Sequence, residues 1–243
     1  MTLFDPITIN GVRIPNRIVK SAMAEGRCDA EGRPTPALAR VYEKWSRGGV
    51  GLMITGMAHI RRHQGYTGKE IGLYDDSLVE PLRALTAAVH RHPGKVFAQL
   101  CHAPPQVSPA TAKRYGCGAP SAGFNRVNLR WDRALSGSEL EALARDFGAA
   151  ARRAREAGFD GVQLHGAHGY LISRMVSPRH NRRTDRWGGD FDRRLAFLQE
   201  VCRAIRNEVG SDFPMTIKLN AHDAARRGLG LETAVRIGER LQK

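Results

Sequence analysis

The chain has 243 residues, of which 42% are hydrophobic and 7% aromatic, so it can bury a substantial core and does not resemble a disordered or collagen-like chain. Its four cysteines lie far apart with no Cys-x-x-Cys pair, which argues against a zinc ribbon or a disulfide framework and favours a reducing compartment. Apolar runs such as residues 50–54 are too short to span a membrane, and the N-terminus has no signal-peptide pattern. We therefore expect a cytoplasmic protein with no membrane partner.

The net charge of +14 comes from arginine, since only seven of the 38 basic residues are lysine. A basic surface can attract nucleic acid or anionic cofactors through long-range electrostatics. Most of the arginines, however, are scattered along expected helices beside acidic residues and alanines, as at Arg152, Arg153 and Arg203. This distribution is typical of solvated helix faces, so we expect no nucleic-acid partner.

Short apolar runs alternate with amphipathic helical patterns along the chain. The expected strands are residues 18–23, 50–55, 96–100, 161–164 and 215–219. The expected helices are residues 36–47, 77–91, 136–157, 192–209 and 232–242. The third of these helices has the clearest boundaries, because Ser136 and Glu139 match a capping box and Gly158 provides a glycine cap. Alternation of this kind predicts parallel strands with helices outside.

Either an open doubly wound sheet or a closed barrel fits this alternation. No Gly-x-Gly-x-x-Gly follows the first strand, which weakens the Rossmann alternative. The long segments 101–135 and 165–190 follow the third and fourth strands and carry His, Arg, Asn and Trp, as the active-site loops of a barrel do. We therefore predict an α/β fold of the TIM (β/α)8 type, with residues 1–243 forming a single domain. Only about five of the eight strand–helix units are present, so the predicted barrel is incomplete and lacks its C-terminal strands, unless the sheet closes by another route.

The densest group of reactive side chains lies in residues 163–170, Gln-Leu-His-Gly-Ala-His-Gly-Tyr, at the end of the fourth expected strand. Period-two alternation places Gln163 and His165 on one strand face, and His168 and Tyr170 follow just past the strand end. Two imidazoles and a phenol could bind a carbonyl oxygen and deliver a proton. A histidine pair could instead bind a metal, or the histidines could be incidental to a glycine-rich turn.

Other strand ends supply different chemistry. Met23 and Ala24 close the first expected strand, Gly56 closes the second, Gln99 lies near the end of the third, and Lys218 lies in the fifth. A glutamine can donate to and accept from a planar heterocycle, and a lysine can stabilise an anion that develops on it. A glycine lets a flat ring approach the backbone closely. Each signal is weak alone, and their convergence on one rim is what favours a ring-binding site.

Several longer motifs carry a more specific signal. They are Phe4-x-Pro6, residues 16–23 (Asn-Arg-Ile-Val-Lys-Ser-Ala-Met), 99–102 (Gln-Leu-x-His), 157–171, 177–189 (ending Trp-Gly-Gly) and 217–220 (Ile-Lys-Leu-Asn). In this order they resemble the Old Yellow Enzyme family of FMN-dependent NADH:flavin oxidoreductases, along the whole chain. The His-Gly-Ala-His-Gly-Tyr run is the most specific of them and raises ene-reductase catalysis above the metal hypothesis.

The resemblance implies that FMN lies across the barrel mouth and that NADH or NADPH reduces it. It implies that Met23 and Ala24 lie against the flavin ring and that Gly56 borders it. It also implies that Gln99 hydrogen-bonds the pyrimidine edge and that Lys218 stabilises negative charge on the reduced flavin.

For catalysis, the resemblance implies reduction of the C=C bond of an α,β-unsaturated carbonyl compound, an enone or enal. The substrate oxygen would lie between His165 and His168, whose hydrogen bonds would polarise the alkene. Tyr170 would then protonate the α-carbon.

The sequence departs from the family pattern in three places. Pro104 and Pro105 stand where the family usually has Gly-Arg, so that loop must follow a different path. Ala24 stands where relatives often carry Thr or Cys, and alanine offers the flavin no hydrogen bond. Strands six to eight, whose loops usually hold the phosphate in such barrels, are absent.

Three alternatives follow from these departures and from the histidines. The chain could be a truncated, catalytically inactive remnant or fragment that does not hold FMN alone, or it could need a homo-oligomer or a complementing C-terminal segment. A metal-dependent hydrolase would use His102, His165 and His168, but no carboxylate stands at a comparable strand end to complete the ligand set. A nucleic-acid-binding module would rest on charge alone.

Overall fold

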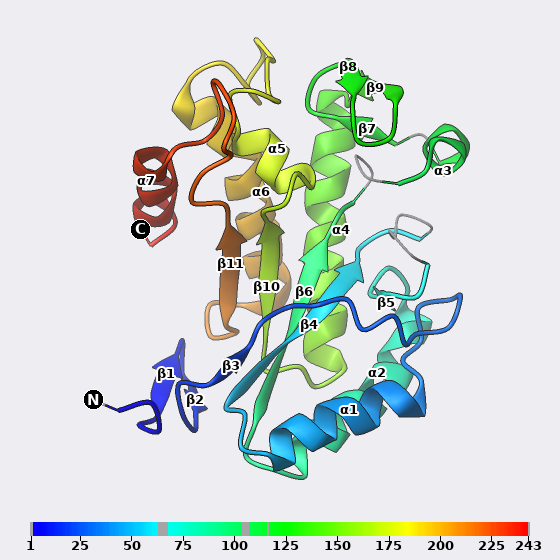
Figure 1. Ribbon diagram of the computed structural model, residues 1–243, viewed down its shortest axis with the longest axis vertical. Coiled ribbons are helices and arrows are strands. Elements are labelled where there is room, and N and C mark those ends of the chain that lie inside the picture. Colours follow the sequence, from blue (N-terminus) through cyan, green and yellow to red (C-terminus); the bar gives the residue numbers. More distant parts are fainter. Residues whose placement is uncertain (1, 63–67, 104–106, 116, 243) are drawn as a thin grey trace.

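The computed structural model describes residues 2–62, 68–103, 107–115 and 117–242. At its centre lies a parallel sheet in the order β11–β10–β6–β4–β3, with the short β5 beside β4 (Figure 1). The strands are β3 (Val19–Lys20), β4 (Leu52–His59), β5 (Ile71–Gly72), β6 (Lys95–Cys101), β10 (Gly161–Gly166) and β11 (Met215–Leu219). They form a half-barrel, which confirms the predicted α/β fold with five of the barrel strands.

Helices cover the outer face of this sheet (Figure 1). They are α1 (Pro36–Arg47), α2 (Val79–His90), α4 (Gly137–Glu156), α6 (Phe191–Val209) and α7 (Leu231–Leu241). The predicted helices are therefore confirmed to within a few residues, and the capping box of Ser136 and Glu139 is present. Gly158 follows α4 with φ 84°, a left-handed conformation that glycine adopts without strain. Among the described helices, none combines the length and apolar character that a membrane crossing requires.

The expected long loops contain further structure. A hairpin of β1 (Ile7–Ile9) and β2 (Val12–Ile14) precedes the sheet. The segment after β6 forms α3 (Pro109–Arg114) and a small sheet of β7 (Gly118–Ala119), β8 (Gly123–Asn125) and β9 (Arg130–Ala134). The short α5 (Leu171–Val176) follows β10 after the four-residue loop 167–170. α3, the sheet of β7–β9 and α5 lie at the end of the molecule where the parallel strands finish, whereas the β1–β2 hairpin lies near the end where they start (Figure 1).

Alternation along the strands separates two cores. The outward residues of β4, β6 and β10, such as Met53, Ala98 and Leu164, pack under the helices in the main core. The inward residues near the start of the strands form a second cluster, in which Phe97 packs against Ile14 of the hairpin. The hairpin therefore plugs the lower part of the half-barrel and leaves the upper inner face to polar side chains.

Two strand ends differ from the sequence prediction. The first strand stops at Lys20, so Met23 and Ala24 lie in an extended segment that carries no ladder hydrogen bonds of its own. The second strand continues to His59, so Gly56 lies inside it and does not close it. Pro104 and Pro105, where the sequence predicts an altered loop path, lie outside the described residues.

A bulge in β4 explains the position of Gly56. Ile54 pairs with Phe97 but Met57 pairs with Gln99, so β4 carries one residue more than β6 between these pairs. The Thr55 hydroxyl accepts a hydrogen bond from the Gln99 backbone N–H at 3.0 Å, which satisfies the donor that the bulge leaves without a ladder partner. The bulge thus holds both the strand and the backbone of Gln99 in place.

We expect Gly56→Ala to lower the free energy of unfolding by about 1–3 kcal/mol, the usual cost of overpacking. A Cβ at this position would lie 2.6 Å from the Met23 carbonyl oxygen and 2.6 Å from the Glu25 carboxylate, so the first loop would have to move. The matched control is Gly238→Ala in α7, where a Cβ meets nothing within 4 Å. That change should be neutral or stabilising by up to about 1 kcal/mol. Urea unfolding followed by circular dichroism measures both, and an equal response would contradict the packing at the bulge.

Candidate functional site

The upper inner face of the half-barrel is polar because parallel pairing aligns polar residues across three strands. His165 of β10 lies opposite Lys218 of β11, and Gln163 lies opposite Gln99 of β6. The Gln99 Nε2 amide donates a hydrogen bond to Gln163 Oε1 at 2.8 Å. Gln163 and His165 therefore share the inner face, as the alternation predicts.

Three aromatic side chains meet at the carboxyl end of β10. The ring centroid of His165 lies 5.0 Å from that of His168 and 4.6 Å from that of Tyr170, with edge-to-face geometry in both pairs. His165 is only 4% exposed and Tyr170 only 7%, while His168 faces solvent. The structure thus brings the predicted residues of this motif together around one point of the strand end.

The protonation of His165 follows from its surroundings. Its Nδ1 accepts a hydrogen bond from the Ala167 backbone N–H at 3.3 Å, so the proton of the neutral ring lies on Nε2. Burial, followed by the positive charges of His168 and Lys218, lowers the pKa of His165 to about 3. The ring is therefore neutral at pH 7 and can donate a hydrogen bond from Nε2. At pH 7 it does not carry the spare proton that the sequence analysis considered for it.

His168 adopts an unusual backbone conformation, with φ 58°. Its N–H donates to the Asn220 side-chain oxygen at 3.1 Å, which ties the loop after β10 to the loop after β11. Burial, and then Lys218, lowers the pKa of His168. Because strained backbone persists only where neighbouring contacts hold it, Asn220 is a positioning residue for His168. The sequence motif at 217–220 includes Asn220, but only the fold assigns it this contact.

Asp223 extends the same link. Its carboxylate accepts hydrogen bonds from the Asn220 amide at 3.0 Å, the Ser177 hydroxyl at 2.7 Å and the Leu229 backbone N–H at 2.8 Å. These bonds hold the pKa of Asp223 below its ordinary value although its partial burial acts in the opposite direction. The loops that follow β10, α5 and β11 are therefore joined through one ionised carboxylate.

The first loop is held to β4 by Glu25, a residue that sequence reasoning did not single out. Its carboxylate accepts hydrogen bonds from the Tyr42 hydroxyl at 2.7 Å and from the Gly56 N–H at 3.2 Å, and it forms a buried ion pair with Lys20. The Lys20 ammonium lies 4.6 Å from the centroid of a Trp45 ring, within cation–π range. A lysine and a glutamate five residues apart in an otherwise apolar segment are the sequence signal for this pair.

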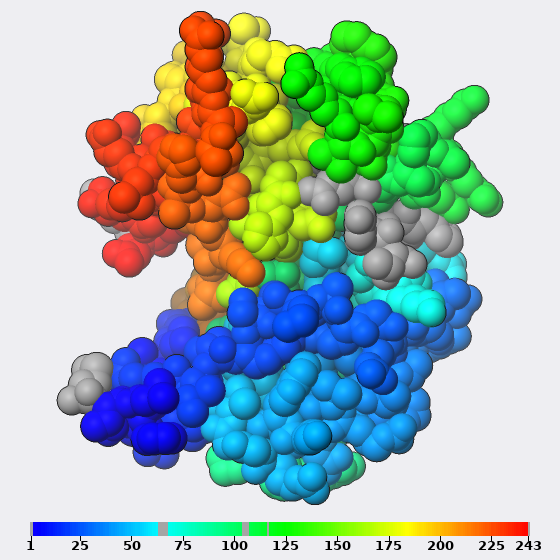
Figure 2. Space-filling model, viewed as in Figure 1, coloured from blue at the N-terminus to red at the C-terminus, as the bar shows by residue number. Residues whose placement is uncertain are grey.

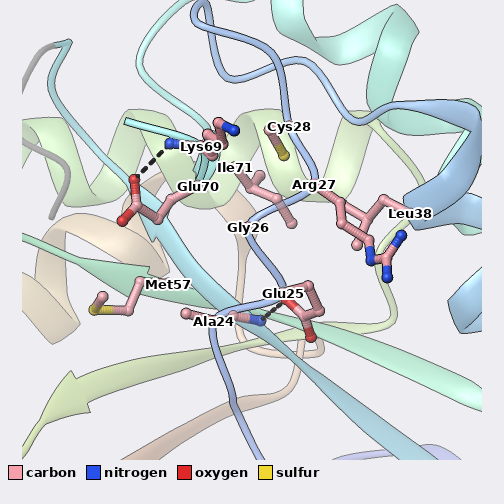
Figure 3. Close-up of a pocket in the computed structure, with 11 residues that line it drawn as sticks. Ala24, Glu25, Gly26, Arg27, Cys28, Leu38, Met57, Lys69, Glu70 and Ile71 are labelled. Carbon is pink, nitrogen blue, oxygen red and sulfur yellow. Dashed lines mark hydrogen bonds between the residues drawn. The ribbon is translucent and has the colours of Figure 1, made fainter. Parts of the chain in front are cut away.

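Figure 3 shows Glu25 beside Ala24 at a small cavity under this loop. Gly56 also lines this cavity. The cavity holds about 10 Å³, roughly one water molecule, so it is too small for an organic ligand. Cys28 borders it, and burial followed by the negative charge of nearby carboxylates raises the pKa of this thiol to about 12. Glu25 therefore acts as a support for the loop, on which Met23 is 66% exposed.

The metal hypothesis finds no support in this geometry. Within residues 2–62, 68–103, 107–115 and 117–242, no three His, Cys, Asp or Glu side chains lie close enough together to hold a metal ion. His102 is buried, and burial keeps its pKa well below the ordinary value. Its carbonyl accepts a hydrogen bond from the Leu171 N–H at 3.3 Å, which joins the end of β6 to α5.

Comparison with known proteins places the chain in a family. Residues 2–239 match the NADH:flavin oxidoreductase / NADH oxidase family. The chain belongs to this family. The resemblance to Old Yellow Enzymes is thereby confirmed, and the structure is similar to an Old Yellow Enzyme homologue from Zymomonas mobilis, with a TM-score of 0.86 and 29% identity.

Two relatives show how the chain aligns. It is 36% identical over 242 residues to an NADH oxidase of Thermoanaerobacter brockii, and 35% identical over 242 residues to an NADPH dehydrogenase of Geobacillus sp. (strain WCH70). Each match covers 99% of this chain, but only 37% of the first relative and 69% of the second. The Zymomonas structure is covered to 71%. The chain therefore spans only part of the length of these family members.

We expect the imidazole of His165 to stay neutral in the folded protein down to about pH 4. Its pKa of about 3 lies below the ordinary value of 6.5. Between these two pH values, His165 is protonated in the unfolded chain but stays neutral in the folded chain. The free energy of unfolding should therefore fall as pH falls from 6.5 toward 3. At pH 5, His165 should account for up to about 2 kcal/mol of this loss. Ring chemical shifts from NMR titration measure the pKa directly.

The His165→Gln variant provides the energetic control for this titration. It removes one of the groups that resist protonation, so its free energy of unfolding should change less between pH 7 and pH 5 than that of the wild-type chain. A folded-state titration of His165 near 6.5 would contradict the neutral, donor-bearing ring.

Proposed function

We propose that this chain is the catalytic part of an FMN-dependent NAD(P)H oxidoreductase that reduces the C=C bond of enones and enals. The observation that carries the proposal is the neutral, Nε2-protonated His165 beside His168 and Tyr170, across from Lys218 on the next strand. A carbonyl oxygen is recognised by fixed hydrogen-bond donors, and a carbon that gains a hydride must then receive a proton. The three aromatic residues offer both functions at one strand end.

The residues on the inner face fit the isoalloxazine ring of FMN. Gln99 uses one amide hydrogen on Gln163 and retains its carbonyl oxygen and second amide hydrogen, the acceptor and donor pair that a pyrimidine edge requires. Lys218 supplies a cation for the side of the ring that becomes anionic on reduction. Met23 offers an exposed apolar surface on the first loop, which Gly56 lets pack closely against β4. FMN, when bound, would supply the hydride that it takes from NADH or NADPH.

The residues of this chain then divide the remaining work. His165 and His168 hold the substrate oxygen by hydrogen bonds and polarise the conjugated alkene. Because both rings have lowered pKa values, they stabilise the developing negative charge as donors and do not transfer their protons. Tyr170, buried beside His165, gives its hydroxyl proton to the α-carbon and regains one from solvent afterwards.

The experiment that tests the function is an FMN titration of the purified chain, followed by anaerobic addition of NADPH or NADH and then of 2-cyclohexenone. Saturable binding, bleaching of the flavin band by the nicotinamide and its return with the enone are the expected results. A folded chain that stays colourless at saturating FMN would overturn the proposal and favour a remnant or fragment that does not hold FMN alone. If the chain needs a second copy or a C-terminal segment, FMN binding should recover when the chain is concentrated or mixed with that segment.

We expect Tyr170→Phe to slow the re-oxidation of reduced enzyme by 2-cyclohexenone by roughly 10²–10⁴-fold, the usual contribution of a positioned general acid. Flavin reduction by NADPH should stay within about twofold, because that step needs no phenol proton. Stopped-flow absorbance separates the two steps. The control is Tyr74→Phe, which removes a hydroxyl that donates to the Glu31 carbonyl outside the site. Equal slowing in both variants would contradict the role of Tyr170.

A further inference from the structure

A basic cleft of about 690 Å³ lies next to the catalytic loop, which comprises residues 167–170 after β10. Its walls are the β8–β9 hairpin, the loop after α5 and the loop after β11, all at the end of the molecule where the parallel strands finish (Figure 1). In Figure 2 these green, yellow and orange segments rise together at the top of the molecule. Its lining includes Arg126, Arg174, Arg179, Arg182, Arg226 and Arg227. Part of the positive charge of the chain is therefore gathered at one cleft, in addition to the arginines that lie along helix faces.

The arginines of this cleft are poorly neutralised. Within the described part of the chain, Arg174 is the one among them with a carboxylate partner, Asp132 at 3.4 Å. Arg179 and Arg182 donate instead to backbone carbonyls, at 3.2 Å and 2.6 Å. The positive charge also affects His180, which lines the cleft. Burial, and then the charge of Arg174, contribute most to lowering the pKa of His180 to about 4. The cleft therefore carries a positive potential that the protein itself does not neutralise.

The cleft is joined to the catalytic loop by direct contacts. Arg174 is about nine-tenths buried on α5, and its Nε donates to the Gly169 carbonyl at 2.7 Å, one residue before Tyr170. Asp223, which links the loop of His168 to α5 through Asn220 and Ser177, precedes Arg226 by three residues. A ligand whose anionic part fills the cleft would thus extend toward the histidine pair.

We propose that this cleft binds the diphosphate of an adenosine diphosphate group, carried by the nicotinamide hydride donor or by a nucleotide-linked substrate of the same site. Arginine guanidinium groups bind phosphate oxygens in bidentate fashion, and the cleft volume lies in the range of small-molecule sites. Phe124, half exposed in the cleft wall and edge-on to Trp131 at 6.0 Å, offers an aromatic face for the adenine. The role of this ligand as hydride donor or substrate rests on the proposed function. Binding of the ADP group itself requires no flavin.

The test is isothermal titration of the full chain, without FMN, with ADP as the probe. Arg226→Gln/Arg227→Gln removes two exposed charges of the cleft and should weaken ADP binding by about tenfold or more. The matched control is Arg40→Gln/Arg47→Gln on α1, which removes the same net charge from exposed positions outside the cleft. It should change the affinity by less than about twofold, because long-range attraction at physiological salt is screened within about 8 Å.

Two competition arms identify the source of the ADP group. Displacement of ADP by NADH or NADPH, with the same loss in the Arg226→Gln/Arg227→Gln variant, assigns the cleft to the hydride donor. Displacement by coenzyme A, with nicotinamide nucleotides ineffective, assigns it to a nucleotide-linked substrate. Either result supports the diphosphate site, and it does so whether or not the chain binds FMN.

Three outcomes would overturn the proposal. They are no saturable ADP binding at millimolar concentration, an equal loss in the cleft variant and the α1 control, and binding of a random single-stranded oligonucleotide that ADP does not displace. The first would leave the ene-reductase proposal standing, since that proposal is decided by the flavin titration. Conversely, a chain that binds ADP but stays colourless with FMN would support the diphosphate site and overturn the ene-reductase proposal.

Discussion

The parallel pairing of β10 with its two neighbours is the constraint on which the rest of the site depends. Its register places His165 opposite Lys218 and Gln163 opposite Gln99. A shift of β10 by one residue against either neighbour would move these side chains to the helix-covered face. Outward residues such as Leu164 prevent that shift, because they fill the main core. Apolar packing on one face of the sheet thus fixes the polar arrangement on the other.

Around this frame, a few buried polar contacts replace regular secondary structure. Glu25 binds the first loop to the bulge of β4, and Asp223 joins the loops after β10, α5 and β11. Each carboxylate collects several donors, which is the arrangement in which a buried charge is stable. Loops at this end of the sheet can therefore be held with little core of their own, as in the extended segment of Met23.

The electrostatics of the molecule favour anions at this end of the sheet. The lowered pKa values of His165 and His180 have the same two causes, burial and nearby cations, although the cations differ. A neutral imidazole beside Lys218 is suited to stabilise negative charge on a substrate or cofactor, while the arginine cleft beyond α5 is suited to phosphate. The first feature lies on the paired strands β10 and β11, and the second lies on the loops beyond them.

The sequence by itself determined the strand–helix alternation and the family, because hydrophobic periodicity and the run from Gln163 to Tyr170 are local properties. It also identified His165, His168 and Tyr170 as neighbours along one strand end. Only the tertiary structure decided that Gly56 lies in a bulge, that Glu25 and Asn220 hold the loops, and that arginines from three separate segments form one cleft. These features depend on contacts between residues distant in the chain, and neither periodicity nor composition encodes which loops will meet.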